Sequence, residues 1–107
     1  MSASRYELLW WSGCPSHGDA YELFASVLHE AGEDPARIVR LQMVTMEDAA
    51  DEGFVGSPTI RVDGRDVDPP DEVVPALTCR VYFSADGRPR PLPDREKIVA
   101  AVRRARA

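Results

Sequence analysis

The chain lacks any apolar run that approaches the roughly 20 residues needed to cross a bilayer. Residues 1–5 also lack the basic region and the long apolar stretch of a secretory signal. We therefore expect a cytoplasmic protein that has no membrane partner.

An excess of positive charge is missing as well. The net charge is -5 and the sequence pI is about 4.9, so phosphate backbones would repel this surface and nucleic acid is excluded as a partner. Hydrophobic residues make up 44% of the chain and charged residues 29%, which is typical of a soluble globular protein. With 107 residues the chain has room for a single domain over residues 1–107.

Cysteine and histidine are scarce, with two of each in the whole chain. A structural zinc site needs four ligands and would consume all of them, so the sequence gives little support for one. In a reducing compartment, two cysteines are more often catalytic, redox-active or metal-binding than a permanent structural disulfide. The two positions to explain are therefore Cys14 and Cys79.

Hydrophobic periodicity and turn residues divide the chain into short elements. The first half of the chain is predicted to form a strand at 7–11, a helix with an apolar stripe from Ala20 to Ala31 that ends at Gly32, a strand at 37–44 and a short helix between Thr45 and Gly53. A hairpin of 58–62 and 65–67 around Asp63-Gly64 follows, and then a proline-rich loop at 68–77. The last predicted elements are a strand at 79–83, a turn at Asp86-Gly87 and a final helix that begins at Asp94. No internal repeat interrupts this order.

This order of elements predicts the fold class. A strand-helix-strand start requires a parallel strand pair with a right-handed crossover. The later hairpin adds antiparallel strands, so we expect an α/β protein with a mixed four-stranded sheet and helices packed on it. The segment near 69–90 is expected to add a loop and a short strand.

The start of the first helix bears on chemistry. Ser16 is predicted to cap this helix, with Asp19 three residues later completing a capping box. Cys14 then lies at the helix N-terminus, where unpaired amides and the helix dipole favour a thiolate. His17 is expected to modulate it, and such surroundings lower a cysteine pKa from about 8.5 to roughly 3.5–7.5.

Two motifs within this order of elements resemble the thioredoxin superfamily: Trp-Ser-Gly-Cys-Pro-Ser-His at 11–17 and Gly-Ser-Pro-Thr at 56–59. The match runs over about 6–67. It implies a thioredoxin-like three-layer fold in which Pro58 belongs to a cis-proline loop across from Cys14. The strings at 56–67 and 77–82 look more narrowly like small bacterial thioredoxin-like proteins, some of which carry the name alkylmercury lyase.

The chain departs from the family where the second cysteine of a Cys-X-X-Cys motif would stand, because His17 occupies that position. A disulfide within the motif is excluded, so a second thiol must come from Cys79. The resemblance implies roles for Cys14 and Pro58. The full set of candidate site residues is Cys14, His17, Pro58 and Cys79 for chemistry and Trp11, Ser57 and Thr59 for substrate contact.

Three functions remain open from the sequence. In the first, Cys14 attacks a protein disulfide or a small thiol-reactive molecule, Cys79 resolves the intermediate, and no cofactor is needed. In the second, Cys14 and Cys79, with His17 as a possible third ligand, bind a soft metal ion such as Cu(I), Zn²⁺ or Hg²⁺, or handle organomercurials. In the third, the groove around Pro58 holds a peptide without catalysis.

Overall fold

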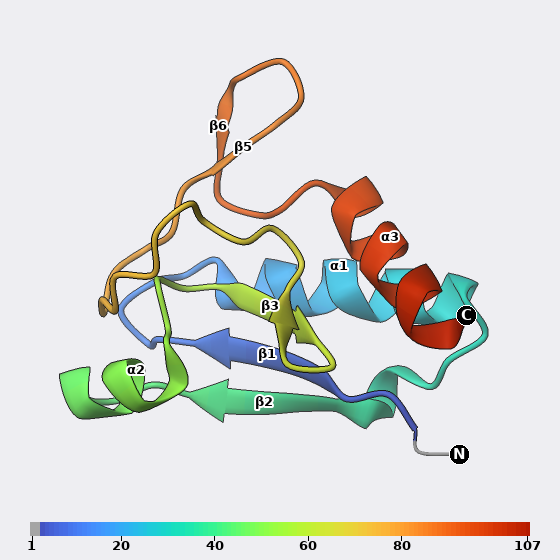
Figure 1. The fold of residues 1–107 in the computed structure, drawn as a ribbon, viewed down its shortest axis with the longest axis horizontal. Helices are drawn as coiled ribbons and strands as arrows, with labels where there is room; N and C mark the ends of the chain where they lie inside the picture. The colour runs from blue at the N-terminus through green and yellow to red at the C-terminus, as the bar shows by residue number, and fades with distance from the viewer. Residues whose placement is uncertain (1–2) are drawn as a thin grey trace.

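A computed structural model describes residues 3–107 (Figure 1). Its elements are β1 (Tyr6–Trp10), α1 (His17–Glu30), η1 (Pro35–Arg37), β2 (Ile38–Gln42), α2 (Met46–Glu52), β3 (Thr59–Val62), β4 (Arg65–Asp66), β5 (Tyr82–Phe83), β6 (Pro89–Arg90) and α3 (Arg95–Arg106). The expected order of elements is confirmed, and β6 and the short 3-10 helix η1 are additions that the patterns did not predict.

The main sheet has four strands in the order β2-β1-β3-β4. β1 and β2 are parallel because α1 crosses between them, and β3 runs antiparallel to β1. The turn between β3 and β4 is made by Asp63 and Gly64, whose φ angles are 53° and 80°. Two successive positive φ angles produce the tight hairpin that the Asp-Gly pair predicts. The mixed four-stranded α/β architecture is therefore confirmed.

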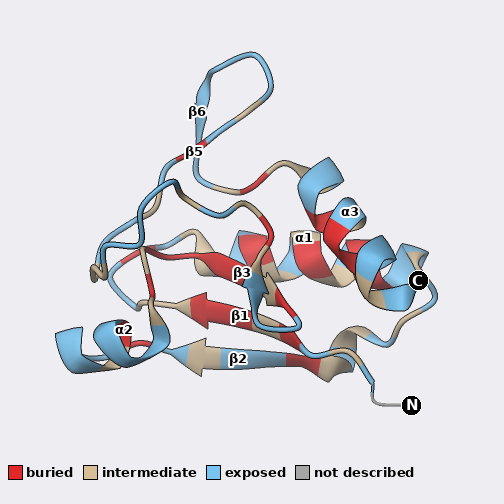
Figure 2. Ribbon diagram, viewed as in Figure 1, coloured by how far each residue is buried: buried red, intermediate tan, exposed pale blue. Residues whose placement is uncertain are grey.

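The core consists of two clusters on opposite faces of β1. Leu8 belongs to the larger cluster, which β1, β2 and β3 share with α1 and α3. Leu9 belongs to the smaller one, with Met43, Ala49 of α2 and Phe54. Because successive strand residues point to opposite faces, the helices cover the sheet from two sides. Figure 2 shows the buried positions concentrated in β1, β3 and the inner faces of α1 and α3.

α2 and α3 begin at the residues that the sequence predicts. Thr45 and Asp48 form a full capping box at the start of α2, and Gly53 ends that helix with a φ of 64°. α3 begins after Asp94 and buries Ile98, Ala101 and Val102. No helix within residues 3–107 is long and apolar enough to span a membrane.

The start of α1 differs from the prediction. Ser16 occupies the N-cap position, but its backbone has helical dihedral angles and its side chain makes no capping hydrogen bond, so the capping box with Asp19 is wrong. The amide and hydroxyl of Ser16 are directed to Cys14 instead. Because an N-cap residue normally has extended backbone and accepts through its side-chain oxygen, the helical backbone of Ser16 accounts for the missing cap.

The predicted strand at 79–83 is also only partly correct. Tyr82–Phe83 pairs with Pro89–Arg90 in a small separate hairpin, which projects from the body of the molecule in Figure 1. Cys79 instead forms a single parallel bridge with Ser57. The reason is that the segment before β5 returns to the end of the sheet where β1 stops, and its main chain pairs there.

Candidate thiol site

Cys14 lies in the turn between β1 and α1. Its amide donates a hydrogen bond to the carbonyl oxygen of Trp11 at 3.1 Å, which folds the chain back just after β1. The side chain is only 2% exposed. Its Sγ donates to the main-chain carbonyl oxygen of Ser57 at 3.4 Å. Cys14 is therefore a covered thiol held against the loop that precedes β3.

That loop contains the proline expected to face Cys14. The Ser57–Pro58 peptide bond is cis, as expected for Pro58, and both residues are fully buried. The amide of Trp11 donates to Oγ of Ser57 at 3.1 Å, which ties the loop to the end of β1. The proline loop and the cysteine turn are thus joined by two hydrogen bonds that both involve Ser57.

Cys79 is also held next to Ser57, by a parallel bridge between the two residues. The amide of Ser57 donates to the carbonyl oxygen of Thr78, and the amide of Arg80 donates to the carbonyl oxygen of Ser57, both at 2.8 Å. These two bonds hold Cys79 beside Cys14, and the two thiols are free rather than joined in a disulfide. In contrast to Cys14, Cys79 is exposed to solvent.

The two thiols have opposite pKa shifts. Burial by itself raises the pKa of Cys14, but a hydrogen bond from Cys79 and others from the amide and hydroxyl of Ser16 outweigh burial. The net pKa of Cys14 is lowered, with Ser57 contributing in the same direction. The pKa of Cys79 is raised, first by its hydrogen bond to Cys14 and then by burial and the nearby negative charge. Cys14 is therefore the group that ionises first.

A polar cluster fixes the segment that carries Cys79. Arg80 pairs with the carboxylate of Asp66 at 2.7 Å, and the two side chains are only 8% and 15% exposed. Arg80 also donates to Oγ1 of Thr59 at 3.2 Å and lies over the ring of Tyr82. The hydroxyl of Tyr82 donates to the carbonyl oxygen of Pro58 at 2.5 Å. We call these four residues, Asp66, Thr59, Arg80 and Tyr82, the arginine clamp.

Gly56 allows the clamp to approach closely. Its φ is 135°, a backbone conformation that side chains rarely adopt. A Cβ at this position would lie 2.9 Å from Cβ of Arg80 and 3.2 Å from its Cα. The glycine thus lets segment 78–80 pack directly on the proline loop.

His17 is placed next to an aromatic ring. Its imidazole stacks on Trp10 with ring centroids 4.4 Å apart, and no hydrogen bond joins it to Cys14 among the described residues. Within residues 3–107, no group of three or more His, Cys, Asp or Glu side chains is arranged to hold a metal ion. The structure therefore brings together Cys14 and Cys79 of the predicted ligands and leaves His17 apart from that pair.

The residues expected to contact substrate are engaged within the chain. Ser57 and Thr59 are 0% and 2% exposed, and Oγ1 of Thr59 donates to the carbonyl oxygen of Gly56 at 2.7 Å. Trp11 is half-buried against the smaller core cluster, and its indole lies where a Cβ on Gly13 would be. Of these three residues, Ser57 bonds the thiol of Cys14 through its carbonyl oxygen. Contact of any of the three with a substrate stays a prediction.

The sequence did not reveal the clamp or the role of Ser16. Arg80 directly follows Cys79, and an arginine beside a cysteine was the one available signal. Nothing in the spacing indicates that Arg80 pairs with Asp66 or that Tyr82 bonds the proline carbonyl. These contacts depend on the path of a proline-rich loop that has no periodicity.

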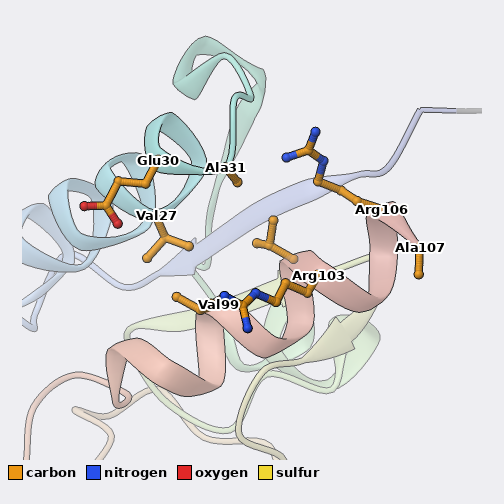
Figure 3. A pocket seen from close by; sticks show the side chains of 8 residues that line it. Val27, Glu30, Ala31, Val99, Arg103, Arg106 and Ala107 are labelled. Atoms are coloured by element: carbon orange, nitrogen blue, oxygen red, sulfur yellow. The ribbon is translucent and has the colours of Figure 1, made fainter.

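A separate groove of about 620 Å³ lies between α1 and α3 (Figure 3). Its lining consists of Val27, Glu30, Ala31, Val99, Val102, Arg103, Arg106 and Ala107. It holds no cysteine or histidine, and Arg106 is paired with Glu33. This groove offers no nucleophile, so the candidate chemistry stays with the two thiols.

Comparison with models of known protein families, with curated proteins and with solved structures finds no match for this chain. The chemistry open to the site follows from its two sulfur atoms. One is a covered thiol with a lowered pKa, and the other is an exposed thiol beside it. Such a pair is suited to disulfide exchange or to two-coordinate binding of a soft cation.

Proposed function

We propose that the chain is a thioredoxin-like thiol protein that exchanges a Cys14–Cys79 disulfide with the thiols and disulfides of other molecules. The observation that carries this proposal is the placement of Cys79 beside Cys14 by the two main-chain bonds to Ser57. A cis-proline loop next to the reactive cysteine supports the thioredoxin-like assignment. Cys79 takes the part that a second cysteine at position 17 would have had.

Cys14 supplies the reactive thiolate of this pair. Its lowered pKa gives it a larger ionised fraction at neutral pH than an ordinary cysteine, and the thiolate is the form that attacks disulfides. In the net reaction a substrate disulfide gains two electrons and becomes two thiols, while the two cysteines lose two electrons and become a disulfide. The reverse reaction oxidises substrate thiols, and no metal or organic cofactor takes part.

The test is reversible disulfide formation within the folded protein. Incubation in glutathione buffers of graded oxidised and reduced ratio should yield a form that is about 2 Da lighter, and its two tryptic peptides, 6–37 and 66–80, should be linked. Cys14→Ser and Cys79→Ser should each abolish the link. A protein that stays reduced across these buffers, or forms links between molecules alone, would refute the proposal.

A second candidate is binding of a soft cation by the two thiolates. The same placement of Cys14 and Cys79 favours it, because Cu(I) and Hg²⁺ accept two thiolate ligands whereas structural zinc sites use four ligands. Native mass spectrometry of the reduced protein with Cu(I) should show one ion per chain in the wild type. Equal uptake by Cys79→Ala would exclude a two-thiolate site.

The peptide-binding alternative meets an obstacle at Ser57. Both its amide and its carbonyl oxygen are already bonded to the chain's own segment 78–80. A peptide strand would pair with Ser57 after that segment had moved away. Thiol exchange needs no such displacement, so we favour it over a peptide-binding module.

A further inference from the structure

We infer that Cys79, rather than Cys14, is the sulfur that exchanges directly with other molecules, and that Cys14 acts inside the protein on Cys79. This inference rests on the proposed function and assigns its order of steps. It reverses the order expected from the sequence, in which Cys14 attacks first and Cys79 resolves the intermediate.

Access separates the two sulfur atoms. Cys14 is 2% exposed and its Sγ is bonded to the carbonyl oxygen of Ser57, whereas Cys79 is exposed. A sulfur attacked by an external thiolate must be reached along the axis of its disulfide bond, so exposure decides which of two sulfurs reacts. An external thiol meets Cys79 first.

The main chain keeps Cys79 in this exposed position. Segment 78–80 is bonded to Ser57 on both sides of the cysteine, and the side chain of Arg80 is held by Asp66. Cys79 is therefore held in place beside Cys14 rather than carried on a free loop. Thiol exchange at Cys79 therefore requires no movement of the loop that contains Ser57 and Pro58.

The chemistry of the leaving group agrees with this order. When the thiolate of an external thiol attacks Sγ of Cys79 in the oxidised protein, a new bond forms between those sulfurs and the Cys14–Cys79 bond breaks. Cys14 then leaves as a thiolate, which its hydrogen bonds from Ser16 stabilise. Because a thiol of lower pKa leaves faster, this stabilisation by Ser16 favours expulsion of Cys14.

A second external thiolate completes the reduction. It attacks the external sulfur of the mixed disulfide and releases Cys79, which takes a proton from water. The external thiols leave as a disulfide, oxidised by two electrons, and the protein holds the Cys79 thiol and the Cys14 thiolate. In the opposite direction, Cys79 loses a proton to water and its thiolate attacks one sulfur of a substrate disulfide, which breaks that bond and releases the other substrate sulfur as a thiolate. The Cys14 thiolate then attacks Sγ of Cys79 and expels the second substrate thiolate.

The experiment compares the two single-cysteine variants. Cys14→Ser leaves Cys79 and Cys79→Ser leaves Cys14, and each is reacted with 5,5′-dithiobis(2-nitrobenzoate) over a range of pH. Rates are divided by the thiolate fraction measured from absorbance at 240 nm. We expect Cys14 to react at least about tenfold more slowly per thiolate, because attack on it waits for a local opening of the fold. In denaturant the two rates per thiolate should become equal, which controls for intrinsic reactivity.

The wild-type protein provides an independent readout. The oxidised form is mixed with limiting glutathione and quenched with excess N-ethylmaleimide, so that mixed disulfides are trapped. Glutathione should be found on peptide 66–80 and maleimide on peptide 6–37. Glutathione on peptide 6–37, or equal reactivity of the two variants, would overturn the inference while the Cys14–Cys79 disulfide itself still forms. Absence of that disulfide would instead refute the proposed function.

Discussion

Ser57 and Cys79 pair through a single parallel bridge, in which both main-chain groups of Ser57 are bonded to the neighbours of the cysteine at 2.8 Å. The same serine accepts the thiol of Cys14 on its carbonyl oxygen. One buried residue thus aligns two cysteines that are about 65 positions apart in the chain.

Replacing Gly56 should disturb the bridge directly. In Gly56→Ala the new Cβ would meet Cβ and Cα of Arg80 at 2.9 and 3.2 Å, and the φ of 135° would be strained. We expect a loss of about 1–3 kcal/mol in the free energy of unfolding, measured with urea. Gly18→Ala is the control, because nothing lies within 4 Å of its new Cβ, and it should be neutral or stabilise α1 by up to about 1 kcal/mol. Equal effects of the two substitutions would contradict the close packing at Gly56.

Removing the hydrogen bond from Cys79 should raise the pKa of Cys14. This bond is the largest of the contributions that lower that pKa, so Cys79→Ala should move the thiolate titration at 240 nm to higher pH. Cys79→Ser retains a hydroxyl donor and should shift the pKa less. If the alanine and serine variants titrate at the same pH, the thiol of Cys79 does not stabilise the Cys14 thiolate.

The lowered pKa of Cys14 also predicts how stability depends on pH. Since the unfolded chain holds this proton at pH values where the folded protein has released it, the stabilising contribution is present above the unfolded pKa of about 8.5. It is lost as the pH falls through the lowered folded value. The difference in free energy of unfolding between Cys79→Ser and the double variant that also carries Cys14→Ser should therefore grow with pH over this window. If the difference in free energy of unfolding did not depend on pH, the pKa of Cys14 would be the same in the folded and unfolded chains.

The arginine clamp should matter for both stability and exchange. Arg80→Met leaves the largely buried carboxylate of Asp66 without its ion-pair partner. We therefore expect the free energy of unfolding to fall by about 3 kcal/mol. Slower closure of the Cys14–Cys79 disulfide should accompany it, because segment 78–80 is less firmly held. Arg88→Met is the control, since its pair with Asp86 is 74% and 55% exposed and should contribute less than about 1 kcal/mol. Unchanged closure kinetics in Arg80→Met would mean that the bonds to Ser57 alone position Cys79.

Local signals predicted much of the fold correctly. The apolar stripe of α1, the Thr45–Asp48 capping box and the Asp63-Gly64 turn each depend on neighbours within a few residues, and each is found in the structure. The same reasoning failed at Ser16, whose backbone has helical dihedral angles and whose side chain makes no capping hydrogen bond. It failed again for the strand at 79–83, where pairing with Ser57 replaced a regular ladder.

By itself, then, the sequence determined that a cysteine stands just before the first helix and that no second cysteine follows three residues later. Periodicity and turn chemistry act over short separations, so they sufficed for that placement. Only the tertiary structure decided that Cys79 lies beside Cys14, and that Cys79 is exposed whereas Cys14 is buried. It also decided that the ion pair of Arg80 and Asp66 holds segment 78–80. Such contacts depend on where a proline-rich loop returns to the sheet, which is set by packing across the whole domain.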